Sequence, residues 1–236
     1  MENKIIIRTE NLHKDFILNK ESKVSAIGGI DLNIEQGEFV AIVGRSGSGK
    51  STLMQLLSGI ILPTQGDVYY RNTNLNKLSN KERAAFRNKE IGFVFQSFFV
   101  EKNLTAYENV EIPLLIQDID KKERERRIEL ALSQVGLSKR KDHKPREMSG
   151  GEIQRVCIAR AMVTDPEVIF ADEPTGQLDF ATSEIIMELF TKMKNENKTV
   201  IMVTHNETDA RKYADRLIRI QDGKITSEEK LKDEQA

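Results

Sequence analysis

A glycine-rich loop between an apolar run and a helical pattern is the feature that most limits what this chain can fold into. The run from Phe39 to Val43 is continuously apolar, which is typical of a buried parallel strand, and Ser51 to Ser58 is helical in pattern. The loop matches G-x-x-x-x-G-K-[ST] without deviation, and its members are Gly44, Arg45, Ser46, Gly47, Ser48, Gly49, Lys50 and Ser51, with Thr52 next. A strand, this loop and a helix in that order predict a phosphate-binding loop in an α/β fold.

The chemistry of the loop follows from its residue types. Glycines let backbone amides curl around phosphate oxygens, and the N-terminus of the following helix adds the positive end of its dipole. Lys50 is a cation that reaches the terminal phosphates, and the Ser51 hydroxyl suits Mg²⁺. The pattern indicates a nucleoside triphosphate and leaves open which one.

A second motif is acidic and also ends an apolar run. Val168 to Ala171 is expected to be a buried strand, and Asp172 and Glu173 follow it directly. Asp172 is placed to hold Mg²⁺ through its water shell, and Glu173 can orient and polarise an attacking water as a general base. The alternative is an exposed Asp-Glu turn before Pro174, which the phosphate loop upstream makes the weaker interpretation.

Three single residues join the two motifs. Gln96 and His205 each follow an apolar run, and Asp179 comes shortly after Glu173. Ligands of open α/β sheets bind at the carboxyl ends of the strands, so we expect these side chains around one phosphate site. Each residue alone would most often be structural, and it is their joint placement that favours a shared site.

Strands that alternate with helices predict one α/β domain over residues 1–236, with a mainly parallel core sheet. We expect a core over about 1–90 and 164–225 and a mainly helical subdomain over about 91–163. Within that subdomain the portion from Ser97 to Asp120, which contains Pro113, is less regular, and Lys121 to Val135 is a helix. Asp222-Gly223 indicates a hairpin. The polar tail, about 226–236, is expected to be frayed.

Composition narrows the function. The formal net charge is −1, so bulk electrostatics give no reason to expect nucleic-acid binding. The single cysteine, Cys157, excludes an intrachain disulfide and is expected to be a buried structural thiol. No run approaches the ~18 apolar residues of a bilayer-spanning helix, so another polypeptide is expected to supply any membrane part.

With these motifs in view, the chain resembles the nucleotide-binding domain of an ATP-binding cassette (ABC) transporter from about Ile5 to Ile225. The resemblance implies a P-loop NTPase fold of ABC type, with an N-terminal antiparallel β part and an inserted helical subdomain. It makes Glu173 the catalytic carboxylate, Gln96 the Q-loop glutamine and His205 the switch histidine. It also implies Mg²⁺ on Ser51, Gln96 and Asp172.

The same resemblance points to ATP and to a second subunit. Phe16 falls where the family places an aromatic ring that stacks on adenine, although a core or loop aromatic is the alternative. Asp179 resembles the D-loop aspartate. The octapeptide from Met148 to Arg155 resembles the signature motif, with Met148 where Leu is usual. Its residues Ser149, Gly150, Gly151 and Glu152 would face an ATP held by another copy of the chain, so a homodimer is expected.

Three stretches together resemble one branch of the family, namely Ile91 to Gln96, Asn103 to Leu114 and Ala171 to Gly176. This branch contains macrolide and antimicrobial-peptide exporters, lipoprotein-release ATPases and the cell-division ATPase. That branch implies an integral membrane permease as partner and a position on the cytoplasmic face of the membrane. The segment from Ser97 to Leu115 is the expected docking surface, and the alternative is that its apolar residues pack under the helical subdomain.

Two other functions stay open at this point. One is a mechanical or signalling ATPase of the cell-division type, which uses the same ATP-hydrolysing domain without moving a solute. The other is a soluble ABC ATPase of DNA repair or chromosome structure. The soluble class needs a long coiled-coil insertion, for which this chain has no room.

Overall fold

The strand before the glycine-rich loop, β3 (Phe39–Val43), is buried along its whole length and lies inside a six-stranded sheet. A computed structural model describes residues 4–19 and 22–231 of the chain. The strand order is β10-β9-β3-β8-β7-β6, and every neighbouring pair is parallel except β9 with β10. The other members are β6 (Ile91–Val94), β7 (Val168–Asp172), β8 (Thr199–Thr204), β9 (Arg216–Gln221) and β10 (Lys224–Lys230). The expected mainly parallel core sheet is therefore confirmed.

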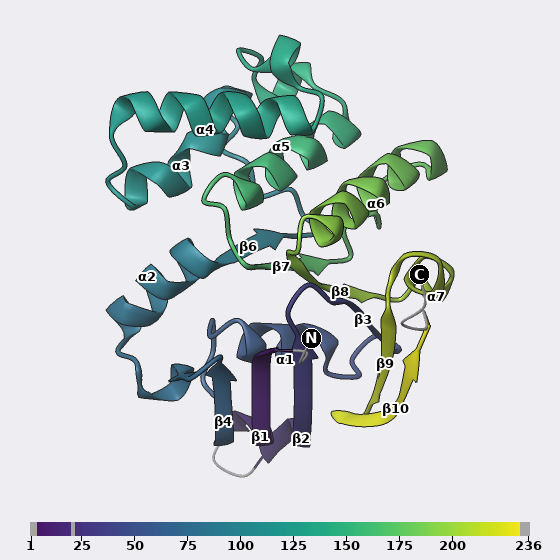
Figure 1. Ribbon diagram of the computed structural model, residues 1–236. Helices are drawn as coiled ribbons and strands as arrows, with labels where there is room; N and C mark the ends of the chain where they lie inside the picture. The colour runs from purple at the N-terminus through teal and green to yellow at the C-terminus, as the bar shows by residue number, and fades with distance from the viewer. Residues whose placement is uncertain (1–3, 20–21, 232–236) are drawn as a thin grey trace.

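A second sheet is antiparallel and has the order β2-β1-β4-β5. Its strands are β1 (Ile5–Asn19), β2 (Ser22–Glu35), β4 (Gln65–Tyr70) and β5 (Thr73–Asn74). Strand β1 runs much further than the apolar triplet Ile5-Ile6-Ile7 indicates. Several register shifts interrupt its pairing with β2, and such bulges break the simple alternation by which a strand is recognised in a sequence. Figure 1 shows this sheet below α1 (Lys50–Leu57), the helix that follows the glycine-rich loop.

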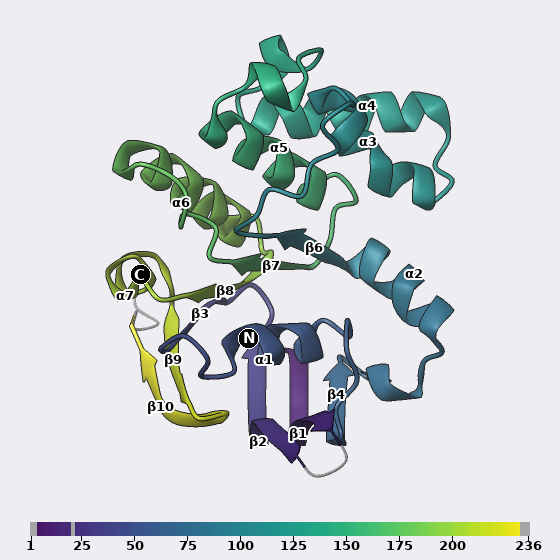
Figure 2. The same cartoon turned by 180° about the vertical axis from the view of Figure 1, so that it is seen from behind.

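The remaining helices are α2 (Asn80–Glu90), α3 (Ala106–Ile116), α4 (Lys121–Gln134), α5 (Gly150–Met162), α6 (Phe180–Asn195) and α7 (Glu207–Tyr213), with short 3-10 turns at Leu75–Lys77, Ser138–Arg140 and Pro145–Glu147. Figures 1 and 2 show α3, α4 and α5 gathered in one group beyond β6 and β7. Strand β6 itself belongs to the large sheet, so the helical group follows Val94 in the chain. Within the described residues, no helix is both long enough and apolar enough to span a bilayer.

Helix α3 is a correction, because the portion from Ser97 to Asp120 was expected to be less regular. Thr105 and Glu108 form a capping box at its start, and Pro113 lies inside the helix. Proline removes one helical hydrogen bond, and this usually argues against a helix interior. Here the fully buried stripe of Ala106, Val110 and Leu114 offsets that loss by packing against the rest of the helical group.

The helix α5 carries the only cysteine of the chain. Cys157 is 1 % exposed, which confirms the expected buried thiol, and its Sγ donates to the carbonyl oxygen of Phe98 at 2.7 Å. Arg160, one turn later, donates to the carbonyl oxygen of Phe99 at 2.8 Å. Burial raises the pKa of the Cys157 thiol to about 11. The segment that follows Gln96 is thus attached to α5 at two neighbouring carbonyls.

The C-terminal hairpin is longer than expected. Residues from Thr226 onward were expected to form a frayed tail, but β10 continues to Lys230. Ion pairs of Glu228 with Arg216 and of Glu229 with Arg211 tie this strand to its surroundings at 2.9 and 2.8 Å. Charged residues at these positions had indicated solvent rather than a strand edge. The final part of the expected tail, residues 232–236, lies outside the described residues.

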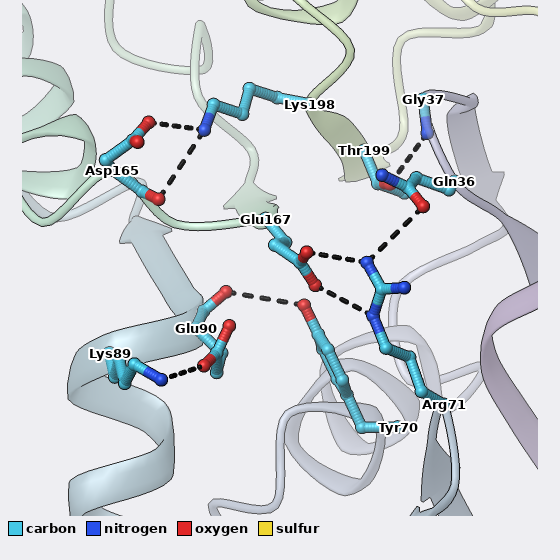
Figure 3. Close-up of polar contacts among 10 residues, drawn as sticks. All are labelled: Gln36, Gly37, Tyr70, Arg71, Lys89, Glu90, Asp165, Glu167, Lys198 and Thr199. Atoms are coloured by element: carbon cyan, nitrogen blue, oxygen red, sulfur yellow. Dashed lines mark hydrogen bonds and ion pairs between the residues drawn. The ribbon is translucent and has the colours of Figure 1, made fainter.

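At the amino ends of the parallel strands, a polar cluster joins the two sheets (Figure 3). Arg71 follows β4 and donates to both carboxylate oxygens of Glu167, at 3.1 and 2.6 Å, and to the side-chain oxygen of Gln36. The backbone of Glu167 bonds in turn to Glu90 and Thr199. A bidentate guanidinium-carboxylate pair has a defined geometry, so it fixes how the antiparallel sheet sits beside β7.

Candidate nucleotide site

The carboxyl ends of the parallel strands bring the separate motifs together. In the sheet Val43 pairs with Thr204, and Asp172 pairs with Val203, so β3, β8 and β7 end at the same level. A cleft of about 570 Å³ opens there. The predicted site residues that line it are Ser46, Gly47, Gly49, Lys50, Ser51, Thr52, Gln96, Asp172, Glu173 and His205. Gly44, Arg45 and Ser48 line a smaller cleft of about 440 Å³ that is also formed by the glycine-rich loop.

The glycine-rich loop is held in a defined shape by its surroundings. Lys50 is 8 % exposed, and its Nζ donates to the carbonyl oxygens of Gly44 and Arg45 at 2.9 and 3.0 Å. Gly49 has φ 103°, and a Cβ there would lie 2.6 Å from the carbonyl oxygen of Ala26. Only glycine fits that backbone angle next to β2 without strain. The Lys50 charge is therefore placed at the loop before any ligand arrives.

The acidic pair, Asp172 and Glu173, lines the same cleft as Lys50. Burial raises the pKa of Asp172, and the neighbouring Glu173 carboxylate raises it further, while a hydrogen bond from Ser51 and the charge of Lys50 lower it. Glu173 has φ 46°, an unusual backbone angle for a residue other than glycine. Strained backbone of this kind persists where the surrounding structure fixes it, and it is common at functional sites.

Two side chains hold the Glu173 carboxylate in place. His205 Nδ1 lies 2.9 Å from Oε1, and Thr204 Oγ1 donates to Oε2 at 3.1 Å. The Thr204 hydroxyl also accepts from the backbone N–H of Asn206 at 3.0 Å. A hydroxyl has one proton, and the Asn206 contact leaves that proton free for Glu173. Thr204 is 2 % exposed, so water does not compete for this bond.

The donor set fits a magnesium ion that is shared with phosphates. Among the described residues, no group of three or more His, Cys, Asp or Glu side chains could hold a metal by itself. Ser51, Gln96 and Asp172 nevertheless face one cleft and supply a hydroxyl, an amide and a carboxylate. Mg²⁺ prefers such oxygen ligands and takes its remaining positions from phosphates and water. A partly buried Asp172 beside a second carboxylate is a place where a cation is stabilised.

The signature residues lie elsewhere on the chain. Ser149 caps α5, and Ser149 and Glu152 form a capping box with backbone-to-side-chain distances of 2.8 and 3.3 Å. The backbone hydrogen bond at Ser149 lowers the pKa of Glu152. None of Ser149, Gly150, Gly151 and Glu152 is among the residues that line the cleft at Lys50. The structure therefore does not bring this motif to the chain's own phosphate loop.

Asp179 and Phe16 also stand apart from the cleft lining. Asp179 caps α6, where its carboxylate accepts from the backbone N–H and the hydroxyl of Thr182, which lowers the pKa of Asp179. Phe16 is 40 % exposed on β1 and pairs in register with Val24, which does line the cleft. The Nζ of Lys14 lies 5.3 Å from the centre of its ring. Stacking of Phe16 on adenine stays a prediction.

Comparison with known proteins identifies the family. The family model described as "ABC transporter" matches residues 27–176, which is more than half of the chain. The chain belongs to the ABC transporter family. The ATP-binding protein YknY of Bacillus subtilis is 45 % identical over 93 % of this chain and 95 % of its own length. The macrolide export ATP-binding/permease protein MacB of Chlorobium phaeobacteroides is 46 % identical, and the match spans only 33 % of that longer protein.

Solved structures agree with this assignment. The ATP-binding cassette MJ0796, from Methanocaldococcus jannaschii, was solved as a dimer in a post-hydrolysis state bound to ADP and Pi. It superimposes with a TM-score of 0.88 at 40 % identity, over 96 % of this chain and 99 % of that one. The P-loop fold of ABC type that the resemblance implied is therefore confirmed.

Sequence reasoning missed part of the site. Asp222 and Gly223 were interpreted only as a hairpin turn, yet they line the cleft, and the N–H of Gly223 donates to the carbonyl oxygen of Ser48 at 3.0 Å. No local pattern at Asp222 signals this contact. Thr204 was not among the predicted site residues, although its place at the end of an apolar run beside His205 was a usable signal.

We predict that Thr204→Val slows ATP hydrolysis, the reaction of this ATPase family. The loss of a hydrogen bond to a charged group should lower kcat about 10-fold or more while KM for ATP changes little. Thr204→Ser keeps the hydroxyl and should restore most of the rate. Steady-state phosphate release measures both values.

The matched control is Thr199→Val, at the other end of β8. Thr199 is also fully buried, and its hydroxyl accepts from the N–H of Gly37 at 3.0 Å, far from the cleft. This variant should lose stability without a specific loss of kcat. Equal losses of kcat in the two valine variants would remove Thr204 from the role of holding Glu173.

Proposed function

We propose that this chain binds Mg²⁺-ATP in the cleft and hydrolyses it with Glu173 as the general base. The observation that carries the proposal is the Glu173 carboxylate, which is 15 % exposed and fixed by two hydrogen bonds in the same cleft as Lys50 and Asp172. Lys50 and the loop amides would hold the phosphates. Ser51, Asp172 and Gln96 would hold the metal, which would neutralise charge on the transferred phosphate.

His205 has a second role in this proposal. Its ring is 70 % exposed, while one nitrogen already contacts Glu173. The other nitrogen is thus free to reach a γ-phosphate in the cleft. Gln96 would help to place the metal and the attacking water. Thr204 would orient Glu173 through its hydroxyl.

We further infer that two chains form the working unit. Ser149 sits at the start of α5, a helix of 13 residues, and does not reach the chain's own cleft. Backbone N–H groups at a helix start and a serine hydroxyl suit a phosphate, so a partner's nucleotide is the natural ligand for this end. The dimeric solved structure of MJ0796 supports the inference.

The third part of the proposal concerns a membrane partner. A groove of about 380 Å³ separates the large sheet from α3 and is lined by Phe93 and Phe95 on one side and by Ile112 and Pro113 on the other. Ile112 and Pro113 belong to the docking segment expected from the sequence, and Phe93 and Phe95 extend that surface. We propose that a permease docks here and holds the chain at the cytoplasmic face of the membrane.

The permease relatives suggest the task of such a complex. By its name, MacB of Chlorobium phaeobacteroides combines an ATP-binding protein and a permease, and this chain matches 33 % of its length. We therefore propose export or release of a macrolide, an antimicrobial peptide or a lipoprotein as the driven process. ATP-dependent closure of the two chains would move a permease seated in the groove.

Glu173→Gln should abolish turnover and retain ATP binding. The amide keeps the size of the side chain but is no longer a base, so we expect kcat to fall about 100-fold or more. Phosphate release and ATP titration measure the two properties. Glu188→Gln, at an exposed position of α6, is the control with the same change of charge. Normal turnover by Glu173→Gln would refute its assignment as the base.

Ser149→Arg should leave ATP binding by the single chain intact and abolish ATP-dependent dimers, because a bulky side chain would occupy the space of the partner's phosphates. Light scattering in the Glu173→Gln background, where ATP persists, measures the dimer. Ser79→Arg is a matched control, since Ser79 forms the same kind of capping box at α2. Each change costs about 1 kcal/mol of helix capping. Dimers that survive Ser149→Arg would contradict the model of two chains around shared nucleotides.

Ile112→Asp should release the chain from membranes, because a carboxylate in the groove opposes an apolar partner. The measurement is the share of the chain that sediments with membranes of the source cells. Leu130→Asp is the control, since Leu130 on α4 is 52 % exposed and lies outside both the groove and the segment from Ser97 to Leu115. If the membrane-bound share falls equally for both variants, or falls for neither, the groove is not the docking site.

A further inference from the structure

The helix that begins at the signature motif is joined to the loop after Glu173 at two places. Gln154, which is 0 % exposed, donates from Nε2 to the carbonyl oxygen of Pro174 at 2.7 Å. One turn earlier, Gly151 packs so closely on Thr182 that a Cβ would overlap the threonine methyl group. Helix α5 therefore contacts the chain on both sides of the loop formed by residues 174–179, at Pro174 and at Thr182 in the first turn of α6.

The same loop directly follows the proposed general base in the chain. Glu173 precedes it, and the N–H of Gly176 turns back to the carbonyl oxygen of Glu173 at 3.1 Å. The amide of Gln96 packs against this turn, because a Cβ on Gly176 would lie 3.0 Å from its Nε2. A displacement of the Pro174 carbonyl would therefore also shift the positions of Glu173 and Gln96.

Stability alone does not account for a glutamine at position 154. The acceptor at Pro174 requires that the amide turns its Nε2 toward it, and the remaining Oε1 is buried with no partner among the described residues. An unpaired buried acceptor costs about 1–3 kcal/mol, which is similar to what one hydrogen bond gains. An apolar side chain of the same length would avoid that cost but would leave the Pro174 carbonyl without this donor, so the two choices differ little in stability. What glutamine adds is a directed link between α5 and Pro174.

We propose that Gln154 is a positioning residue that couples the signature helix to the catalytic turn of the same chain. The inference rests on the proposed function, in which the Ser149 end of α5 meets the partner's nucleotide. When α5 closes on that nucleotide, the Gln154–Pro174 bond carries the turn behind Glu173 with it. Each chain thereby senses ATP in one site and sets the carboxylate of the other, so the two sites become competent together.

The first experiment uses Gln154→Met, which keeps the length of the side chain and removes the donor. We expect kcat to fall about 10-fold with KM for ATP within about twofold, because a link used at catalysis is lost and nucleotide binding is not. Gln117→Met is the matched control: Gln117 also donates from Nε2 to a backbone carbonyl, that of Asn88, at 2.8 Å and away from the cleft. A fall in kcat of equal size in the control would overturn the proposal.

Mixed dimers then show whether Gln154 positions Glu173 of its own chain or only supports the signature motif. One chain carries Glu173→Gln, so hydrolysis occurs only in the site whose Glu173 is intact. Gln154→Met placed in the chain with the intact Glu173 should reduce hydrolysis, while the same change in the other chain should leave it near the reference. Loss only in the second arrangement, or equal loss in both, would show that Gln154 merely holds α5 and would overturn the proposal.

Hydrogen exchange tests the link between Gln154 and the turn after Glu173 even if the chain does not dimerise. In the single chain, Gln154→Met should speed exchange at the backbone amides of Gly176 and Leu178, which close the turns behind Glu173, and Gln117→Met should not. Unchanged protection at both amides would overturn the proposal. Failure of the wild-type chain to dimerise with ATP would instead refute the proposed two-chain function, so the two failures are distinguishable.

Discussion

Parallel pairing of β3, β8 and β7 is the constraint on which the rest of the site depends. These strands end at one level, which places the glycine-rich loop, Thr204 and Asp172 on the same edge although they are far apart in the chain. Parallel strands require long crossovers, and here the crossovers hold the helical group and α6. The sheet thus fixes the chemistry at its edge and leaves the connecting segments to carry the surfaces that we propose meet other molecules.

The antiparallel sheet has a less obvious role as a brace. Gly28 of β2 donates to the carbonyl oxygen of Gly223 at 2.9 Å, and Gly223 donates to that of Ser48 at 3.0 Å. This chain of backbone bonds supports the glycine-rich loop from behind, while Lys50 closes it from within. A loop ordered before binding loses less conformational entropy when phosphates arrive. Arg71 and Glu167 repeat the connection at the opposite end of the strands.

Much of this site could be predicted from the sequence because its motifs are local. A continuous apolar run followed by Lys50 and Ser51, or by Asp172, reports a strand end and its chemistry within a few residues. Contacts set by tertiary packing could not be predicted in this way. The approach of Asp222 to the cleft depends on how the hairpin folds back, and the helix around Pro113 exists because its buried stripe outweighs the proline.

The burial of Cys157 has a practical consequence for labelling chemistry. Thiolates, not thiols, react with maleimides, and a pKa of about 11 in a side chain that is 1 % exposed leaves this cysteine almost inert near neutral pH. Because the chain has no other cysteine, a thiol introduced on its surface would be the one that reacts. Spectroscopic probes can thus be attached at a chosen position without first removing a native residue that anchors the segment after Gln96.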